Sequence, residues 1–118
     1  MIQKIETGNI WLANLNPNKG VEPGKVRPVL ILQNQALLDI AHPSTLIVPL
    51  TTNLVDHIYP LRVRIHAKDD LKKDSDLLVS QIRAIDNRRL ISGPLTKVTH
   101  KQLQVIYAAV REVMGMDD

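Results

Sequence analysis

Short apolar runs separated by turn residues fill most of this sequence, and their spacing limits the fold more than any other feature. Residues 9–15 alternate apolar and polar side chains, as in a half-buried strand, and residues 16–20 supply a turn. Residues 29–32 and 46–50 are continuous apolar runs rich in β-branched side chains. Runs of this kind are typical of strands buried on both faces, so we expect two central strands there.

The later runs are shorter and carry more charge. Leu61, Val63 and Ile65 alternate with two arginines, which predicts one buried face and one basic face. Residues 76–85 predict a further strand, bent near Gln81, and residues 95–98 predict a short last one.

The end of the chain has a helical pattern instead. Thr99 and Gln102 fit a capping box, in which the Thr side chain and the Gln side chain each satisfy a backbone N–H. Apolar residues then recur at helical spacing, at Leu103, Ile106, Val110 and Val113. Gly115 is a natural terminator. Close-set strands followed by one amphipathic helix predict a mainly β fold with α, a compact antiparallel β-barrel sealed by a C-terminal helix.

Length and composition limit the class of protein. At 118 residues the chain fits one domain, 1–118. It contains no Cys, so we expect neither disulfides nor a thiolate metal site. The sequence has no long apolar run, which excludes a helical membrane span, and its first residues lack the apolar segment of a signal peptide. We therefore expect a cytoplasmic protein.

The net charge of +3 and the pI near 9.4 favour an acidic partner such as nucleic acid, although a solvated basic face would give the same balance. Aromatic residues make up only 3% of the chain. Modules that hold single strands mainly by stacking, and barrels that grip proline-rich peptides, need more exposed rings than this.

Metal and nucleophilic chemistry have little support in the sequence. The four His residues are scattered and show no ligand spacing such as HExxH. There is no G-x-S-x-G elbow and no Gly-rich phosphate loop. The mixed charges of residues 68–74 indicate a solvated loop. We therefore expect no metal and no cofactor.

Two segments could nevertheless bind a phosphate. In the first, Pro28 favours an extended backbone at Arg27, which would fix the guanidinium at the mouth of a strand. In the second, residues 49–53, a buried strand opens into a polar loop at Thr51. An Arg fork beside a hydroxyl suits a phosphate group. From spacing alone, a salt bridge from Arg27 to Glu22 with a Thr-capped turn is the simpler interpretation.

The order of several short motifs resembles the MazF/PemK family of toxin–antitoxin ribonucleases. The matching segments, spread over nearly the whole chain, are Gly8-Asn9-Ile10-Trp11-Leu12, Leu15-Asn16-Pro17, Gly20-x-Glu22-x-Gly24-x-Val26-Arg27-Pro28-Val29, Val48-Pro49-Leu50-Thr51-Thr52 and Ser80-Gln81-Ile82-Arg83-Ala84-Ile85-Asp86. Single pairs such as Arg-Pro carry little information, whereas the ordered set is specific.

This resemblance implies a small SH3-like barrel of the CcdB/Kid/MazF type, a homodimer, and single-stranded RNA bound in a groove at the dimer interface. It implies an endoribonuclease that acts without metal, through a 2′,3′-cyclic phosphate and a free 5′-hydroxyl. An antitoxin with an acidic, flexible tail would be the partner. By position, Arg27 and Thr51 match the catalytic pair and Glu22 matches the loop glutamate.

The same resemblance suggests which residues bind RNA. Gln81 and Arg83 match the strand that borders the groove. The two candidate loops add Lys25, Thr52, Asn53 and His57 as possible RNA contacts. His57 is also a remote candidate for the general base.

The sequence departs from the family pattern at Ser80, where many relatives carry an acidic residue that takes part in catalysis in some of them. Asp76 lies too far along the strand to be a sure substitute. Two other functions therefore remain open: a non-catalytic toxin on the same barrel that binds DNA gyrase, and an RNA-binding module with a silent site.

Overall fold

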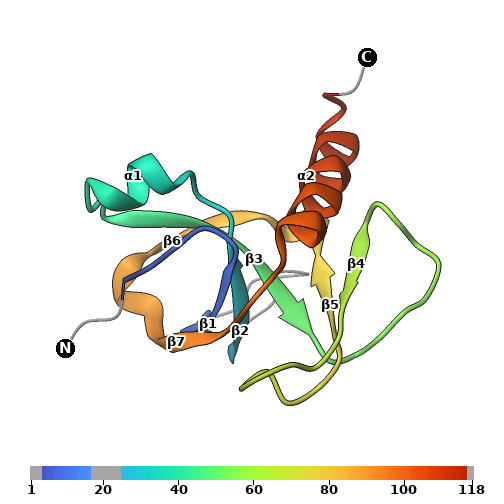
Figure 1. The fold of residues 1–118 in the computed structure, drawn as a ribbon, viewed down its shortest axis with the longest axis horizontal. Coiled ribbons are helices and arrows are strands. Elements are labelled where there is room, and N and C mark those ends of the chain that lie inside the picture. Colours follow the sequence, from blue (N-terminus) through green and yellow to red (C-terminus); the bar gives the residue numbers. More distant parts are fainter. Residues whose placement is uncertain (1–3, 17–24, 117–118) are drawn as a thin grey trace.

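The structure is a computed structural model, and it describes residues 4–16 and 25–116. This part of the chain forms mostly short strands, with one long helix at its end (Figure 1). The strands are β1 (Asn9–Asn14), β2 (Val26–Ile31), β3 (Ser44–Thr51), β4 (Arg62–Ile65), β5 (Ser75–Leu78), β6 (Arg83–Asp86) and β7 (Leu90–Lys97). The helices are α1 (Gln35–Asp39) and α2 (His100–Met114), with 3-10 turns η1 (Val79–Gln81) and η2 (Asn87–Arg89).

All the strand pairs are antiparallel, in the order β4-β5-β3-β2-β1-β7, and β6 also pairs with β3. Strand β3 organises this sheet. One of its edges pairs with β2, while the other pairs with β6 along its first half and with β5 at its end. The turn η1 makes the bend between β5 and β6, so the strand predicted over 76–85 is two strands broken at the expected place.

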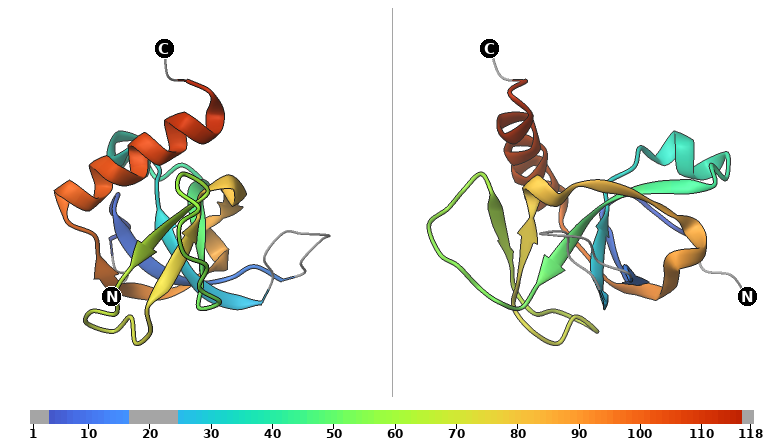
Figure 2. Two further views of the ribbon diagram at one scale, coloured as in Figure 1. Left: turned by 90° about the vertical axis from the view of Figure 1, so that its right-hand side faces the viewer. Right: turned by 180° about the vertical axis from the view of Figure 1, so that it is seen from behind.

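The sheet curls strongly, but within the described ranges its edge strands β4 and β7 do not pair with each other. It is therefore barrel-like without being closed. The predicted fold class, an antiparallel β structure with a C-terminal helix, is confirmed. Seen from behind, α2 lies over the β4–β5 end of the molecule, away from α1 (Figure 2).

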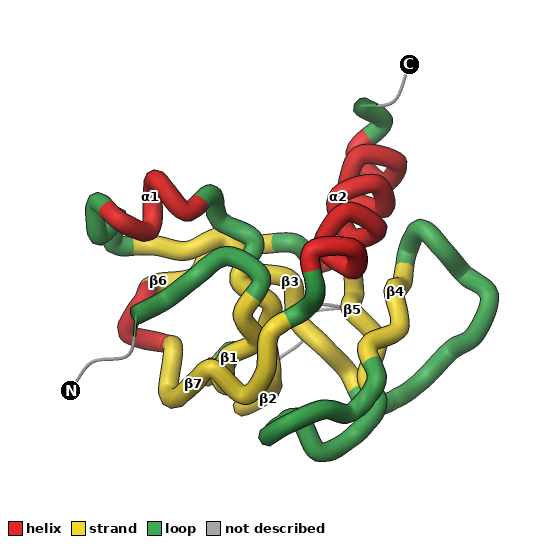
Figure 3. Tube along the Cα trace, viewed as in Figure 1, coloured by secondary structure: helices red, strands yellow, loops and turns green. Residues whose placement is uncertain are grey.

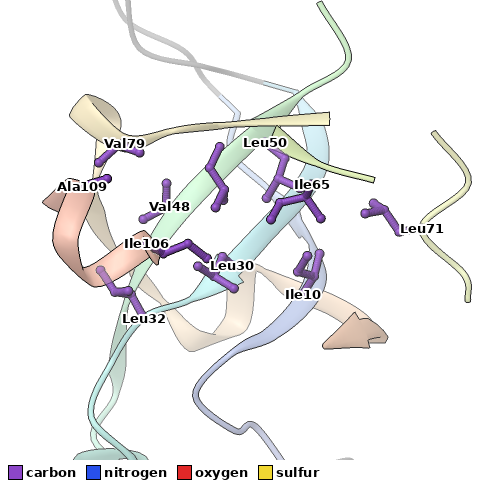
Figure 4. Close-up of a cluster of buried hydrophobic side chains, with 11 residues drawn as sticks. Ile10, Leu30, Leu32, Val48, Leu50, Ile65, Leu71, Val79, Ile106 and Ala109 are labelled. Carbon is purple, nitrogen blue, oxygen red and sulfur yellow. The ribbon is translucent and has the colours of Figure 1, made fainter. Parts of the chain in front are cut away.

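Two apolar clusters explain why β2 and β3 are apolar on both faces. One lies under α2, where Ile106 and Ala109 meet Leu30 and Val48 (Figure 4). The other lies on the opposite face of the same strands, and its buried members are Trp11, Ala13, Leu15, Val29, Ile31, Ile47 and Ile85. The alternating strand residues divide between the two clusters, as the pleat of a strand requires.

The ends of α2 are capped as the sequence predicts. Gln102 N–H donates to Thr99 Oγ1 over 3.1 Å, and Thr99 N–H donates to Gln102 Oε1 over 2.8 Å. At the other end, Gly115 adopts a left-handed conformation with φ of 68°. These two caps fix the length of the helix that covers the first cluster.

Replacing Thr99 by Ala should lower the free energy of unfolding by about 1 kcal/mol, because the backbone N–H of Gln102 would lose its acceptor. Urea denaturation followed by circular dichroism measures this change. Lys101→Ala, at an exposed position of the same helical turn, is the control and should leave the midpoint nearly unchanged. An unchanged midpoint for Thr99→Ala would contradict the capping role.

Several local features differ from the sequence-based expectations. The last strand, predicted over 95–98, is β7 and begins at Leu90. Residues 35–39 form α1, which was not predicted; it has no buried residue and is capped by Asn34, whose side chain accepts from Ala36 N–H. Leu61, predicted to be buried, is 49% exposed and lies directly before β4. Leu71, within the predicted solvated loop, is buried in the first cluster.

No helix in the described ranges is both long enough and apolar enough to cross a membrane.

Candidate active site

The antiparallel pairing of β2 with β3 brings Arg27 and Thr51 to the same place. Val29 faces Pro49 and Ile31 faces Ile47, so the same register carried two residues further sets Arg27 opposite Thr51. Residues that face each other across antiparallel strands point to the same side of the sheet. Arg27 Nη1 donates to the backbone oxygen of Leu50 over 3.3 Å, which holds the guanidinium at the end of β3.

A pocket of about 220 Å³ opens at this position. Its lining residues are Val26, Arg27, Pro28, Leu50, Thr51, Thr52 and Ser75. The two sequence segments singled out as possible phosphate sites therefore share one pocket. Because Arg27 and Thr51 are both partly exposed, a ligand in the pocket can reach them.

The hydroxyl of Thr51 is oriented by the loop that follows it. The backbone N–H of Asn53 donates to Thr51 Oγ1 over 3.2 Å. A hydroxyl can accept and donate at the same time, so its proton stays available for a ligand oxygen. Thr51 is thus presented as a hydrogen-bond donor beside a guanidinium.

The polar row continues across the sheet beyond Thr51. Thr51 pairs with Asp76 on β5, and Asp76 pairs with Arg64 on β4. Only 1% of the Asp76 side chain is exposed. Its carboxylate accepts from Arg64 Nε over 2.5 Å, from Val55 N–H over 2.9 Å and from Arg62 Nη1 over 3.2 Å.

These contacts decide the charge of Asp76. Burial acts to raise the pKa of this carboxyl, but the hydrogen bonds from Arg64, Val55 and Arg62 outweigh burial and hold the pKa below its ordinary value. In return, Asp76 and then Asp56 raise the pKa of Arg64. A buried carboxylate with a lowered pKa and several bound donors is a poor proton acceptor. Its burial and its bound donors argue against Asp76 as the substitute for the acidic residue that the family pattern has at the position of Ser80.

The loop of residues 52–61 forms a wide arc between β3 and β4 (Figure 3). A second pocket, of about 180 Å³, lies under this arc. Its lining residues are Val55, Asp56, His57, Ile58, Tyr59, Arg62, Arg64 and Asp76. His57, one of the predicted RNA contacts, therefore borders this neighbouring pocket and not the pocket of Arg27 and Thr51.

The other predicted site residues are spread along the same face or lie next to the pocket. Thr52 lines the Arg27 pocket, and Lys25 is exposed directly before β2.

Arg83 on β6 pairs with Ile47, four residues before Thr51 on β3, so it points to the same side roughly 13 Å away. Gln81 ends η1, between Arg83 and β5. Asn53 is exposed in the loop after β3. Glu22 lies outside the described residues.

Sequence reasoning missed the cluster of Asp76, Arg62 and Arg64. The alternating arginines of β4 predicted a basic face, but the acidic residue that neutralises them is on another strand, and its register was not readable. Among the described residues, no group of three or more His, Asp or Glu side chains is placed to hold a metal ion.

The pattern of strands, the pocket and the ordered motifs can be compared with known proteins. A family model for the PemK-like, MazF-like toxin of type II toxin–antitoxin systems matches residues 6–114. The chain belongs to this family. The match spans every described strand and helix, including both halves of the candidate site.

Two curated relatives agree with this membership. The chain is 33% identical to an endoribonuclease MazF of Staphylococcus saprophyticus over 113 residues, which cover 95% of this chain and 92% of that protein. It is 36% identical to endoribonuclease EndoA of Bacillus subtilis over 100 residues, which cover 81% of this chain and 79% of that protein. The predicted enzyme class, endoribonuclease, is that of these MazF-type relatives.

Solved structures agree with the fold. MazF of Deinococcus radiodurans superposes with a TM-score of 0.80 at 22% identity, covering 98% of this chain and 100% of that one. Toxin MazF-mt6 of Mycobacterium tuberculosis gives a TM-score of 0.76 at 20% identity, covering 93% and 99%. At these identities the likeness supports the fold alone.

Proposed function

We propose that this MazF-type toxin cleaves single-stranded RNA at the pocket of Arg27 and Thr51, by attack of the ribose 2′-hydroxyl on the adjacent phosphate. One observation carries the proposal: a guanidinium and a donating hydroxyl, from two neighbouring strands, line the same pocket on one face of the sheet. A phosphodiester with a developing negative charge is the ligand that this pair fits best.

In this mechanism the 2′-oxygen bonds to phosphorus while the bond from phosphorus to the 5′-oxygen breaks. The products are a 2′,3′-cyclic phosphate and, once the leaving 5′-oxygen has taken a proton from water, a free 5′-hydroxyl. Arg27 stabilises the charge of the pentacovalent phosphorane, because its guanidinium offers a positive charge and a planar fork of donors to the non-bridging oxygens. The Thr51 hydroxyl donates a hydrogen bond to a non-bridging oxygen. Since the nucleophile belongs to the substrate, alignment and electrostatics supply most of the acceleration.

The proton of the 2′-hydroxyl needs an acceptor. We assign this role to Glu22, by its position in the family motif. Among the described residues the buried Asp76 is unsuited to it, for the reasons given above. His57 borders the neighbouring pocket and stays a second candidate for the base.

RNA on both sides of the cleaved bond would run along the same face of the sheet. Thr52 lines the pocket, and the exposed residues Lys25 and Asn53 each lie next in sequence to a lining residue. Gln81 is in η1, and Arg83 is on β6 opposite Ile47. We assign these residues to binding of the strand, with the backbone phosphates supplying much of the affinity. Such a toxin would act in the cytoplasm, where its RNA substrates are.

We also propose that the chain forms a homodimer and is inhibited by an antitoxin with an acidic, flexible tail. Two structures of similar fold support an antitoxin as the partner: a Deinococcus radiodurans MazE–MazF structure, and a mycobacterial endoribonuclease in complex with its cognate antitoxin. The net charge of +3 suits an acidic tail. Because the tail and RNA would compete for one basic face, their binding should be mutually exclusive.

Incubation of the purified protein with a long single-stranded RNA tests the activity. We expect discrete fragments whose ends are a 2′,3′-cyclic phosphate and a 5′-hydroxyl, as read by end-specific ligation and sequencing. Intact RNA with measurable binding would point to the silent RNA-binding module. Intact RNA together with inhibition of DNA gyrase would point to the gyrase-binding toxin.

Excess chelator should leave the rate of cleavage unchanged, because none of the proposed steps uses a metal. Raising the salt concentration should weaken RNA binding, since the displaced counterions no longer favour association. Cleavage measured with and without EDTA, over a series of salt concentrations, checks both statements. Loss of activity with EDTA that is restored by a divalent ion would overturn the mechanism.

A further inference from the structure

We propose that Asp76 is a positioning residue for the Thr51 hydroxyl and acts on it through Arg62 and the backbone of Asn53. This inference rests on the proposed function, because it concerns the same pocket. Asp76 does not line the pocket of Arg27 and Thr51. Asp76 is on β5, the strand next to β3, directly opposite Thr51.

A continuous path of hydrogen bonds joins the two side chains. Arg62 Nη1 donates to the Asp76 carboxylate over 3.2 Å and to the backbone oxygen of Asn53 over 2.7 Å. The N–H of the same Asn53 donates to Thr51 Oγ1 over 3.2 Å. The orientation of the Thr51 hydroxyl therefore depends on where the backbone of Asn53 is held, and Arg62 holds it.

Asp76 also holds the loop directly. The backbone N–H of Val55 donates to Asp76 Oδ2 over 2.9 Å, two residues after Asn53. A second arginine strengthens this attachment, because Arg64 bonds to Asp76 through Nε and to Asp56 through Nη2 over 2.7 Å. Three bonds thus hold the loop segment 53–56. The backbone of Val55 bonds to Asp76, the backbone of Asn53 to Arg62, and the side chain of Asp56 to Arg64.

This arrangement differs from an ordinary surface salt bridge. Side-chain exposure is 20% for Arg62, 29% for Arg64 and 1% for Asp76, so water screens the cluster poorly. Removing the charge of Asp76 would leave two arginines without their common acceptor and release the loop on which Thr51 depends. A displacement of the hydroxyl by a fraction of an ångström is enough to weaken its contact with the phosphorane.

The test is a double-mutant cycle between Asp76→Asn and Thr51→Ala, with cleavage of single-stranded RNA measured under single-turnover conditions. Asp76→Asn alone should lower the cleavage rate constant by about tenfold, less than the 100-fold that a 1 Å misplacement can cost. In the Thr51→Ala background the same change should cost less than about twofold, because the group that Asp76 positions is already absent.

RNA affinity separates positioning from a general loss of structure. We would measure it with an RNA that carries deoxyribose at the cleaved position and therefore cannot react. Asp74→Asn is the matched control, since it removes the same charge from an exposed carboxylate whose partners are His66 and the N–H of Ala67. Asp76→Asn and Asp74→Asn should bind this RNA equally well, and only Asp76→Asn should cleave slowly.

If circular dichroism shows that Asp76→Asn does not fold, Arg62→Met replaces it in the cycle. This variant keeps a long unbranched side chain but has no donor in place of Nη1, the atom that bonds both Asn53 and Asp76, so the same tenfold loss is expected. Equal losses in the wild-type and Thr51→Ala backgrounds would overturn the inference and leave the proposed function intact. If the wild-type protein itself does not cleave RNA, the proposed function fails, and this inference with it.

Discussion

Replacing Arg27 by Ala is expected to lower RNA cleavage by about two to four decades, the range seen when an acid–base group or an oxyanion donor is removed. The phosphorane carries its extra charge on the non-bridging oxygens, and Arg27 supplies the guanidinium at the end of β3. Single-turnover cleavage of a single-stranded RNA measures the loss, and circular dichroism checks that the variant is folded.

Two further variants make the result specific. Arg88→Ala removes the same charge from a side chain that is 91% exposed and pairs with Asp86, outside the pocket, so it should leave cleavage nearly unchanged. Arg27→Lys keeps the charge but loses the planar fork, and it should recover only part of the rate. Near-normal cleavage by a folded Arg27→Ala variant would remove Arg27 from the mechanism.

Much of this fold could be predicted because its signals are local in the sequence. A run of β-branched residues indicates a strand wherever it occurs, and the capping box of Thr99 and Gln102 marks the start of α2 without reference to the rest of the chain. The bend near Gln81 was also visible, since the apolar pattern breaks there. These local signals do not indicate which strand pairs with which.

The pairing of strands explains why the position of Asp76 beside Thr51 was not predicted. Asp76 lies 25 positions after Thr51 in the sequence, and only the antiparallel β3–β5 register makes them neighbours. The same limit applies to Leu61 and Leu71: periodicity suggested one buried and one solvated residue, and the tertiary packing reversed both. The short helix α1 has no buried face, so no apolar periodicity could reveal it.

The proximity of Arg27 and Thr51 depended on a different kind of information. Spacing alone favoured a local salt bridge and a capped turn, and the resemblance to the toxin family shifted the interpretation towards one shared site. The structure places both residues on one pocket. Their catalytic roles stay predictions, to be decided by the kinetics of the two variants.

Thr51→Ala is expected to slow cleavage by about one to two decades, less than the loss for Arg27→Ala. Thr51 contributes one neutral hydrogen bond where Arg27 contributes a full charge, and charge-assisted hydrogen bonds are roughly twice as strong. The pocket is also open enough for water to replace the missing hydroxyl in part. Single-turnover cleavage at saturating enzyme isolates the chemical step from RNA binding.

Thr51→Ser is the matched variant, because it retains the hydroxyl and the acceptor for the N–H of Asn53. It should cleave within a few-fold of the wild-type rate, while Thr51→Ala should not. A loss of equal size in both variants would mean that the methyl group of Thr51, and not its hydroxyl, matters at this position. Because the hydroxyl is held by Asn53, and Asn53 by Arg62, a slow Thr51→Ala with an active Thr51→Ser would also identify the atom that Asp76 positions.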